Sequence, residues 1–120
     1  AETIVYFHRA VTFVYLGDYK SAEKDLEIVL KEEPTNQDAL FNMASVKMNT
    51  DQLGDAIQYF NTLLTYYPNH AASYHYRGVA YLNLGKRAEA CSDLQKAADR
   101  KYPPSAEVLQ KYCSQRSISL

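Results

Sequence analysis

The chain has 120 residues, of which 47% are hydrophobic and 22% are charged, and its formal net charge is −1. This composition is ordinary for a globular domain and excludes a disordered chain. Because the 13 Lys and Arg residues are scattered rather than clustered, we expect neither nucleic acid nor an anionic membrane surface as a partner. No apolar run approaches the ~20 residues that span a bilayer, so we expect no membrane insertion.

The strongest signal along the chain is an internal repeat with a period of 34 residues. Pro34 and Pro68 lie 34 residues apart, and Pro103 follows 35 residues later. Small or apolar residues recur at the same interval: Ala22, Ala56 and Ala90; Leu26, Phe60 and Leu94; Tyr6, Leu40 and Tyr74; Ala10, Ala44 and Gly78. A period in this range indicates a solenoid built from repeated helical units.

Within each copy the spacing predicts two helices. Tyr74, Gly78 and Tyr81 follow one another at i, i+4 and i+7, which places them on one helical face. Ala90, Leu94 and Ala97 repeat this spacing in the second half of the same copy. Each copy is therefore a helix–turn–helix unit whose two helices pack against each other.

Turn and capping residues separate these helices. Gly17 and Gly85 can supply the positive φ that ends a helix, whereas the middle copy has Asp51 at this position. A proline near the end of each copy disfavours helix at the preceding residue. The residues that follow these breaks and can cap the next helix are Asn36, Asn69 and Ser105.

The residues at these registers resemble the tetratricopeptide repeat over residues 3–104. The resemblance implies an all-α fold, a right-handed α-solenoid of three antiparallel helix pairs at about 3–36, 37–70 and 71–104, in a single domain. A capping helix at about 105–114 brings the total to seven helices, and residues 115–120 form a tail. The sequence departs from the family pattern at Lys47 and Asp51, and at Arg9 and Arg77, where Leu is common.

Chemistry-bearing motifs are absent from the sequence. No His or Cys lies at close metal-ligand spacing, and we interpret His8 and His75 as partly exposed helix residues. Glu32 and Glu33, before Pro34, are solvated charges rather than an acid–base pair. No phosphate loop, nucleophile elbow or HExxH motif occurs. We therefore expect no enzyme activity, no cofactor and no metal.

The two cysteines leave two alternatives open. Cys91 lies early in the second helix of the last repeat and Cys113 lies late in the capping helix, so antiparallel packing can bring them close. Free buried thiols, which we favour, are consistent with a cytoplasmic protein. A disulfide would imply an oxidising compartment, periplasmic or extracellular.

In proteins similar to this one, the first helices of successive repeats line a concave groove where peptides bind. The stripe beside the core stripe is largely apolar here, which is more apolar surface than one core contact buries. We predict the following groove residues: Ile4, Phe7, Val11, Val14, Phe41, Asn42, Ser45, Met48, His75, Tyr76, Val79, Leu82 and Leu109. Asp38 lies on the same stripe.

One known use of such grooves is not expected here. Family members that bind chaperone tails hold a C-terminal carboxylate with Lys, Arg and Asn side chains. The equivalent positions carry Phe7 and Val11, then Asn42, then Ala72 and Tyr76, so only Asn42 matches. Without cations there is little to neutralise a carboxylate.

The predicted function is a non-catalytic scaffold or adaptor that binds an apolar or amphipathic segment of another protein. The alternative is a structural or self-associating fragment of a longer repeat protein, with no peptide ligand of its own. In that case the stripe is filled by the tail Ser117–Leu120, by further repeats or by a second copy of the chain. Because the chain starts at Ala1 without Met, we expect further sequence upstream.

Overall fold

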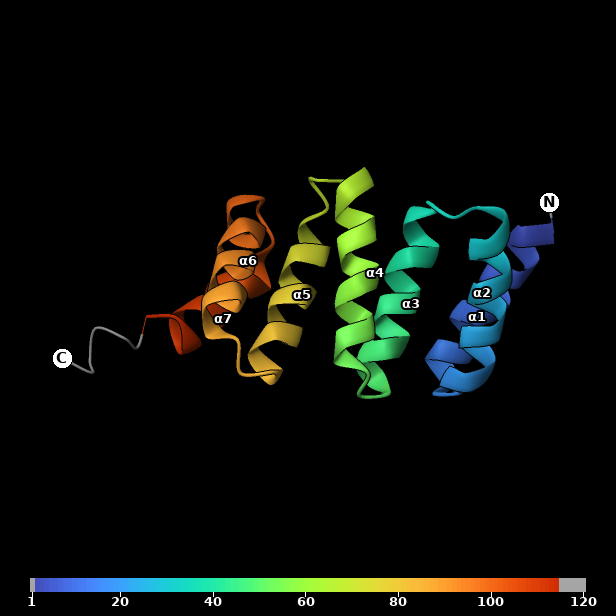
Figure 1. The fold of residues 1–120 in the computed structure, drawn as a ribbon, viewed down its shortest axis with the longest axis horizontal. Coiled ribbons are helices and arrows are strands. Elements are labelled where there is room, and N and C mark those ends of the chain that lie inside the picture. Colours follow the sequence, from blue (N-terminus) through green and yellow to red (C-terminus); the bar gives the residue numbers. More distant parts are fainter. Residues whose placement is uncertain (1, 115–120) are drawn as a thin grey trace. The chain divides into compact units, whose positions relative to one another are not determined.

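The computed structural model describes residues 2–114, which form seven α-helices and no strand (Figure 1). These helices confirm the predicted all-α fold class of three antiparallel helix pairs followed by a capping helix. Their bounds are α1 Glu2–Leu16, α2 Tyr19–Glu32, α3 Gln37–Asn49, α4 Leu53–Tyr66, α5 Ala71–Asn83, α6 Arg87–Asp99 and α7 Pro103–Tyr112. The predicted tail, 115–120, lies outside the described residues.

The chain divides into two compact units, Ala1–Tyr67 and Pro68–Leu120. The first unit contains α1–α4, and the second contains α5–α7. The assignment of all 120 residues to one domain stays a prediction.

A residue with positive φ ends the first helix of every repeat. Gly17 and Gly85 have φ values of +81° and +77°, and Asp51 adopts the same left-handed conformation with φ of +60°. The three residues are spaced by 34, so the middle repeat keeps the turn and places an L-residue where glycine is favoured. The repeat register therefore holds through the turn as well as through the helices.

Capping agrees with the sequence at one helix and differs at two. The Asn36 side chain accepts a hydrogen bond of 2.9 Å from the Ala39 amide, as predicted for the start of α3. The prediction for Asn69 is wrong, because His70 caps α5 and its Nδ1 accepts from the Ser73 amide at 3.3 Å.

The start of the last helix also differs. Helix α7 begins at Pro103, with prolines in its first turn, and Tyr102 is the N-cap residue. Proline is favoured in a first turn because its missing N–H has no partner there in any case. Ser105 is therefore no cap, and the predicted capping helix at 105–114 is shifted two residues toward the N-terminus.

Small and branched apolar residues build the core of the first unit. Helices α1, α2 and α3 contribute seven residues with no exposed surface to one cluster: Ala10, Ala22, Leu26, Val29, Ala39, Met43 and Val46. A second cluster joins α3 to α4 through Ala44, Ala56 and Phe60. Alanine at the helix crossings lets the backbones approach, which is why the repeated Ala positions are the invariant part of the pattern.

In the second unit α5 and α6 pack closely at Gly78. A Cβ atom built on Gly78 would lie 2.9 Å from Cγ of Leu94 and 3.2 Å from the carbonyl oxygen of Ala90. The glycine at this position, where the other repeats have Ala10 and Ala44, is therefore required by the packing of α5 on α6.

The two arginines that depart from the family pattern form ion pairs with buried aspartates inside their own repeats. Arg9 donates to Asp25 through Nε and Nη2 at 2.7 and 2.8 Å, and Arg77 makes the same two bonds to Asp93. Both aspartates are 3% exposed. The hydrogen bonds and charges of these carboxylates raise the pKa of both guanidinium groups.

The middle repeat replaces this ion pair as a unit. The register positions of Arg9 and Asp25 hold Met43 and Tyr59 there. Met43 is fully buried, and Tyr59 packs against the same core cluster. A charged pair and an uncharged pair therefore serve equivalent positions in one chain.

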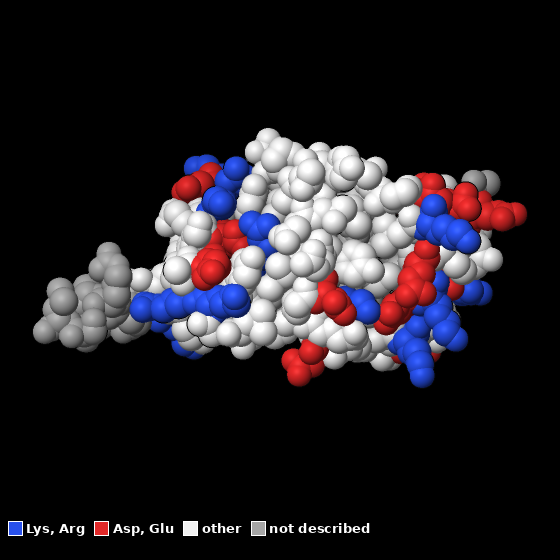
Figure 2. Space-filling view, viewed as in Figure 1, with Lys and Arg blue, Asp and Glu red and all other residues white. Residues whose placement is uncertain are grey.

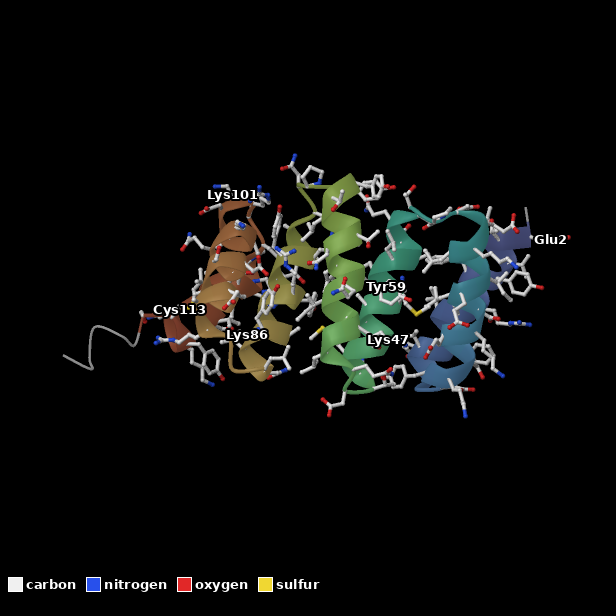
Figure 3. All side chains as sticks on the ribbon, viewed as in Figure 1. Glu2, Lys47, Tyr59, Lys86, Lys101 and Cys113 are labelled. Carbon is white, nitrogen blue, oxygen red and sulfur yellow. A yellow bond between two sulfur atoms is a disulfide. The ribbon has the colours of Figure 1, made fainter. Side chains whose placement is uncertain are left out.

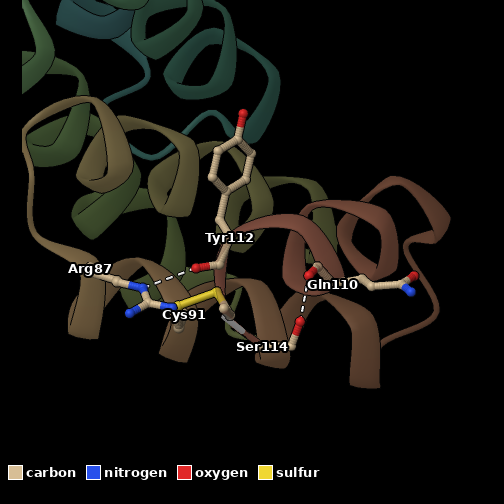
Figure 4. The surroundings of a disulfide bond; sticks show 6 residues. Arg87, Cys91, Gln110, Tyr112 and Ser114 are labelled. Carbon is tan, nitrogen blue, oxygen red and sulfur yellow. Dashed lines mark hydrogen bonds between the residues drawn. A yellow bond between two sulfur atoms is a disulfide. The ribbon is translucent and has the colours of Figure 1, made fainter. Parts of the chain in front are cut away.

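The cysteines form a disulfide, so the expectation of free thiols is wrong. The bond joins Cys91 in α6 to Cys113 at the C-terminal end of α7, with a Cα–Cα distance of 5.8 Å (Figure 4). Beside it, Nε of Arg87 donates to the Tyr112 carbonyl at 2.9 Å. These bonds fasten the last turn of α7 to the start of α6.

None of the helices in the described range is both long enough and apolar enough to cross a membrane.

Candidate functional site

The side of α1 that the sequence assigns to a groove is only partly covered. Ile4 is 60% exposed and Val11 is 39% exposed, whereas Phe7 and Val14 are half-buried against the core cluster of the first unit. Phe7 and Val14 therefore contribute to core packing as well as to the open surface. This leaves an apolar surface along α1 in the first unit.

A cleft with a volume of about 390 Å³ lies at the N-terminal end of this surface. It brings the predicted groove residues Ile4 and Phe7 of α1 beside Asp38 of α3. Five further residues complete its lining: Thr3, His8, Val29, Glu33 and Asn36. Because α1 and α3 are the first helices of successive repeats, both begin at this end of the unit, and the cleft lies between their first turns.

Glu33 is the best-positioned charge in the cleft. Thr3 Oγ1 donates to its Oε2, and Asn36 Nδ2 donates to its Oε1, each at 2.7 Å. These two hydrogen bonds stabilise the ionised carboxylate and lower the pKa of Glu33. The sequence interpretation of Glu33 as a freely solvated charge missed this arrangement, because the Thr3 partner is 30 residues away in the sequence.

A second cleft of about 690 Å³ adjoins the first and shares Thr3 and Glu33 with it. Its other lining residues are Glu2, Tyr6, Ile28 and Glu32. Figure 3 places Glu2 at the N-terminal end of α1. The N-terminal end of the first unit therefore combines carboxylates with exposed apolar side chains, of which Ile28 is 39% exposed.

The four predicted groove residues of α3 are half-buried. Phe41 and Met48 are half-buried against the Ala44–Ala56–Phe60 cluster, and the Phe41 and Phe60 rings meet edge to face at 6.1 Å. The Asn42 side chain donates to the Asp38 carbonyl at 2.8 Å. Ser45 is also half-buried. The structure thus places all eight predicted residues of the first unit on α1 or α3, and brings Ile4 and Phe7 into one cleft.

In the second unit the predicted residues are less open. Tyr76 is 37% exposed, and Val79, Leu82 and Leu109 are half-buried. The rings of His75, Tyr76 and Tyr102 form a cluster with centroid separations of 4.9 to 6.4 Å. A hydrogen bond to Tyr76, with burial adding to it, raises the pKa of Tyr102 to about 12.

His75 is not a groove residue, and the prediction that it is partly exposed is wrong. It is 6% exposed, and its Nδ1 lies 2.7 Å from Oγ of Ser105, which is fully buried in α7. Burial lowers the pKa of His75 because it disfavours the charged imidazolium. His8, by contrast, is exposed as predicted.

Charged side chains gather over α2 and α6 on the face shown in Figure 2, whereas α4 is almost uncharged there, with Asp55 as its one charged residue. The single Lys on α3, Lys47, is 8% exposed and donates to Glu23 of α2 at 3.0 Å. Burial alone would lower the pKa of Lys47, but the hydrogen bond and charge of Glu23 outweigh it and raise the pKa. Figure 3 shows Lys47 and Tyr59 lying in the first unit.

No group of three or more metal-ligating side chains occurs in residues 2–114. The geometry instead offers apolar surface and fixed charge.

Comparison with known proteins identifies the repeat. One family model of the tetratricopeptide repeat matches residues 14–77, and a second model with the same description matches residues 72–105. No curated protein sequence matches the chain.

Solved structures share the fold at low sequence identity. The first tetratricopeptide repeat domain of Spaghetti (RPAP3), bound to the HSP90 peptide SRMEEVD, is 19% identical with a TM-score of 0.89, covering 96% of this chain and 93% of that chain. YrrB, described as having an unusual peptide-binding site, is 21% identical with a TM-score of 0.85, and MamA is 23% identical with a TM-score of 0.80. The match covers 90% and 86% of this chain and 57% of each of those two chains.

Proposed function

Because this chain belongs to the tetratricopeptide repeat family, we propose that it is a non-catalytic protein-interaction module. Its first unit binds a segment of a partner protein along the surface between α1 and α3. The observation that carries this proposal is the cleft between the first turns of these helices, which continues into the exposed apolar side chains of α1. The peptide-bound RPAP3 structure and the peptide-binding site of YrrB support the same use of the fold.

The chemistry of the surface favours a helix or an extended segment with an apolar side. Ile4 and Val11 lie seven residues apart on α1, with Phe7 between them, so they form one continuous stripe. An isolated stripe of this kind is costly in water, and covering it with apolar side chains of a partner recovers roughly 25 cal/mol per Å². This is the pattern by which grooves recognise helices.

The proposal is tested by selection of binding peptides from a random library displayed on phage. Peptides selected on the wild-type chain should lose binding to the Phe7→Glu and Val11→Glu variants, which place a charge in the stripe. The Glu27→Gln variant, altered on the exposed side of α2, is the matched control and should bind as the wild type does. Circular dichroism must show unchanged helical content in all three variants.

Selected peptides that bind Phe7→Glu and Val11→Glu as tightly as the wild type would refute the groove between α1 and α3. A selection that yields no binder at all would refute peptide binding as the function.

A second candidate function, self-association, is favoured by a different side of α1. Val5 is 64% exposed, although the equivalent residue of α3, Ala39, is fully buried in the core of the unit. Likewise Arg9 has 55% of its side chain exposed, whereas the equivalent Met43 is fully buried. Light scattering at several concentrations tests this alternative: a Val5→Glu variant should dissociate any dimer, and a strict monomer would exclude it.

A further inference from the structure

We propose that the cleft between α1 and α3 selects segments in which a lysine or arginine lies next to an apolar side chain. This inference rests on the proposed function and adds the chemical class of the partner. It predicts a partner whose charge is opposite to that of the HSP90 peptide SRMEEVD bound by RPAP3, which contains two glutamates and an aspartate.

The first observation is the sign of the charge around the cleft. The residues that line the two adjoining clefts include four carboxylates, Glu2, Glu32, Glu33 and Asp38, and neither Lys nor Arg. His8 is the one other titratable residue in the α1/α3 cleft. Lys31 lies in the last turn of α2 but lines neither cleft.

The second observation is that the cations of α1 and α3 already have partners. Each helix carries one Lys or Arg, Arg9 on α1 and Lys47 on α3. Arg9 is held by Asp25 and Lys47 by Glu23, both on α2. Neither side chain lines the cleft, so neither neutralises its carboxylates.

The third observation is that Glu33 is already oriented. Hydrogen bonds from Thr3 and Asn36 fix both of its oxygens at 2.7 Å, so little rotational freedom remains to be lost on binding. Carboxylate oxygens carry further lone pairs, so Glu33 can accept a third hydrogen bond from an ammonium or guanidinium group. Glu33 is ionised at neutral pH, as an ordinary glutamate is, and the two hydrogen bonds lower its pKa further.

The fourth observation is that the apolar stripe begins beside this carboxylate. Ile4 and Phe7 line the cleft together with Glu33 and Asp38, and Val11 continues the stripe one turn further on. A segment that covers Ile4 and Phe7 with an apolar side chain therefore brings its neighbouring residues to the carboxylates. A cation at that position is attracted, whereas a carboxylate is repelled and loses its hydration.

The test uses two matched peptides of equal length. Both carry the same Leu and Ala residues on one helical side, and the first has Lys at every position where the second has Glu. Fluorescence anisotropy should show the Lys peptide binding the intact chain on the order of tenfold more tightly, from two or three exposed charge pairs. Raising the salt concentration should reduce this preference because exposed charges are screened.

Two double variants test which carboxylates cause the preference for the Lys peptide. The Glu33→Gln/Asp38→Asn double variant should lose the preference for the Lys peptide while keeping the shape of the cleft. The Glu27→Gln/Glu107→Gln double variant changes the net charge equally at exposed residues that line neither cleft, and it should keep the preference.

The outcomes separate this inference from the proposed function. Equal binding of both peptides, tighter binding of the Glu peptide, or a preference that survives in Glu33→Gln/Asp38→Asn would overturn the inference. Sensitivity of any selected peptide to Phe7→Glu would then still support the groove. Failure of both matched peptides to bind would overturn the inference too. The groove itself would be refuted by an empty phage selection, or by selected peptides that bind Phe7→Glu and Val11→Glu as tightly as the wild type.

Discussion

At the scale of single residues, the two helices of a repeat are joined at the register of Arg9 and Asp25 by either a charged or an uncharged pair. Repeats one and three join their helices with an Arg–Asp pair, and repeat two uses Met43 and Tyr59 at the same register. The charged pair depends on both partners, because a buried charge without its partner is costly. The uncharged pair, Met43 and Tyr59, depends on packing alone.

Removing one partner of the Arg77–Asp93 pair should therefore cost more than replacing both. The side chains are 17% and 4% exposed, and Asp93→Asn should lower the free energy of unfolding by about 2–3 kcal/mol. Introducing Arg77→Met together with Asp93→Tyr, the pair of the middle repeat, should recover most of this loss. Urea unfolding of Arg77→Met, Asp93→Tyr and the double variant measures the coupling between the two positions, and additive losses would contradict it.

The turn residue Asp51 carries backbone strain that its counterparts avoid. It has φ of +60° where the other repeats have Gly17 and Gly85. Because glycine adopts positive φ freely, Asp51→Gly should raise the free energy of unfolding by about 0.5 kcal/mol, after the entropy of glycine in the unfolded chain is subtracted. Gly17→Ala and Gly85→Ala should lower it by about 1 kcal/mol. A stability loss in Asp51→Gly on urea unfolding would show that the Asp51 side chain stabilises the turn.

His75 gives the second unit a pH dependence of defined sign. Burial lowers its pKa below the ordinary 6.5 in the folded state, so the unfolded state binds a proton more readily. Its contribution to stability is fully present above pH 6.5 and is lost as the pH falls from there through the folded pKa. Thermal unfolding between pH 7.5 and pH 5, values bracketing the ordinary pKa of about 6.5, should show this loss, and His75→Gln should flatten the profile. His8→Gln, altered at an exposed site, should leave the pH dependence of the unfolding temperature unchanged. A flattened pH dependence in His8→Gln would show that His75 is not its source.

At the scale of elements, α7 is the shortest of the seven helices. Ser105 is its one buried residue, and it is held to its unit by the His75–Ser105 contact, the Arg87–Tyr112 bond and the disulfide. The disulfide closes a loop with a sequence separation of 22. Cross-linking a loop of this length removes conformational entropy from the unfolded chain.

Reduction of Cys91–Cys113 should therefore lower the stability of the second unit by about 3 kcal/mol. Hydrogen exchange before and after treatment with a dithiol reductant should show lost protection in α7, while α1–α4 stay protected. The Cys91→Ser/Cys113→Ser variant should match the reduced protein. Unchanged protection of α7 in both would contradict the importance of the bond.

Sequence reasoning predicted the elements best where they repeat. Ala22, Ala56 and Ala90 share a period of 34 because each lies at an equivalent helix crossing, and helices form where that period predicts them. The same reasoning placed Ile4 and Phe7 on one surface. Repetition carries this information because the same contact recurs in every unit.

Contacts made once in the chain could not be predicted this way. The His75–Ser105 contact depends on how α7, which no second helix follows in the described residues, lies against α5. The Cys91–Cys113 bond and the Thr3–Glu33 hydrogen bond likewise join residues outside the repeated pattern. Helical spacing does not predict these three contacts, because tertiary packing sets the environment of their residues.

At the scale of the whole molecule, the chain consists of two compact units that carry different features. The first contains the cleft and the exposed apolar stripe of α1, and the second contains the aromatic cluster and the fastened α7. Neither unit has a group of three or more side chains that could hold a metal ion among the described residues. Binding of a protein segment is the function that we propose for the first unit.

The most direct test of this central claim is the footprint of a bound peptide on the first unit, mapped by NMR chemical shifts of backbone amides and side-chain methyl groups. A peptide selected from the random library should perturb Ile4, Phe7 and Val11 on α1 and Phe41 on α3. Residues on the exposed side of α2, such as Lys24 and Glu27, should keep their shifts. A footprint on α2 or α4 that leaves Ile4, Phe7 and Val11 unperturbed would contradict the claim.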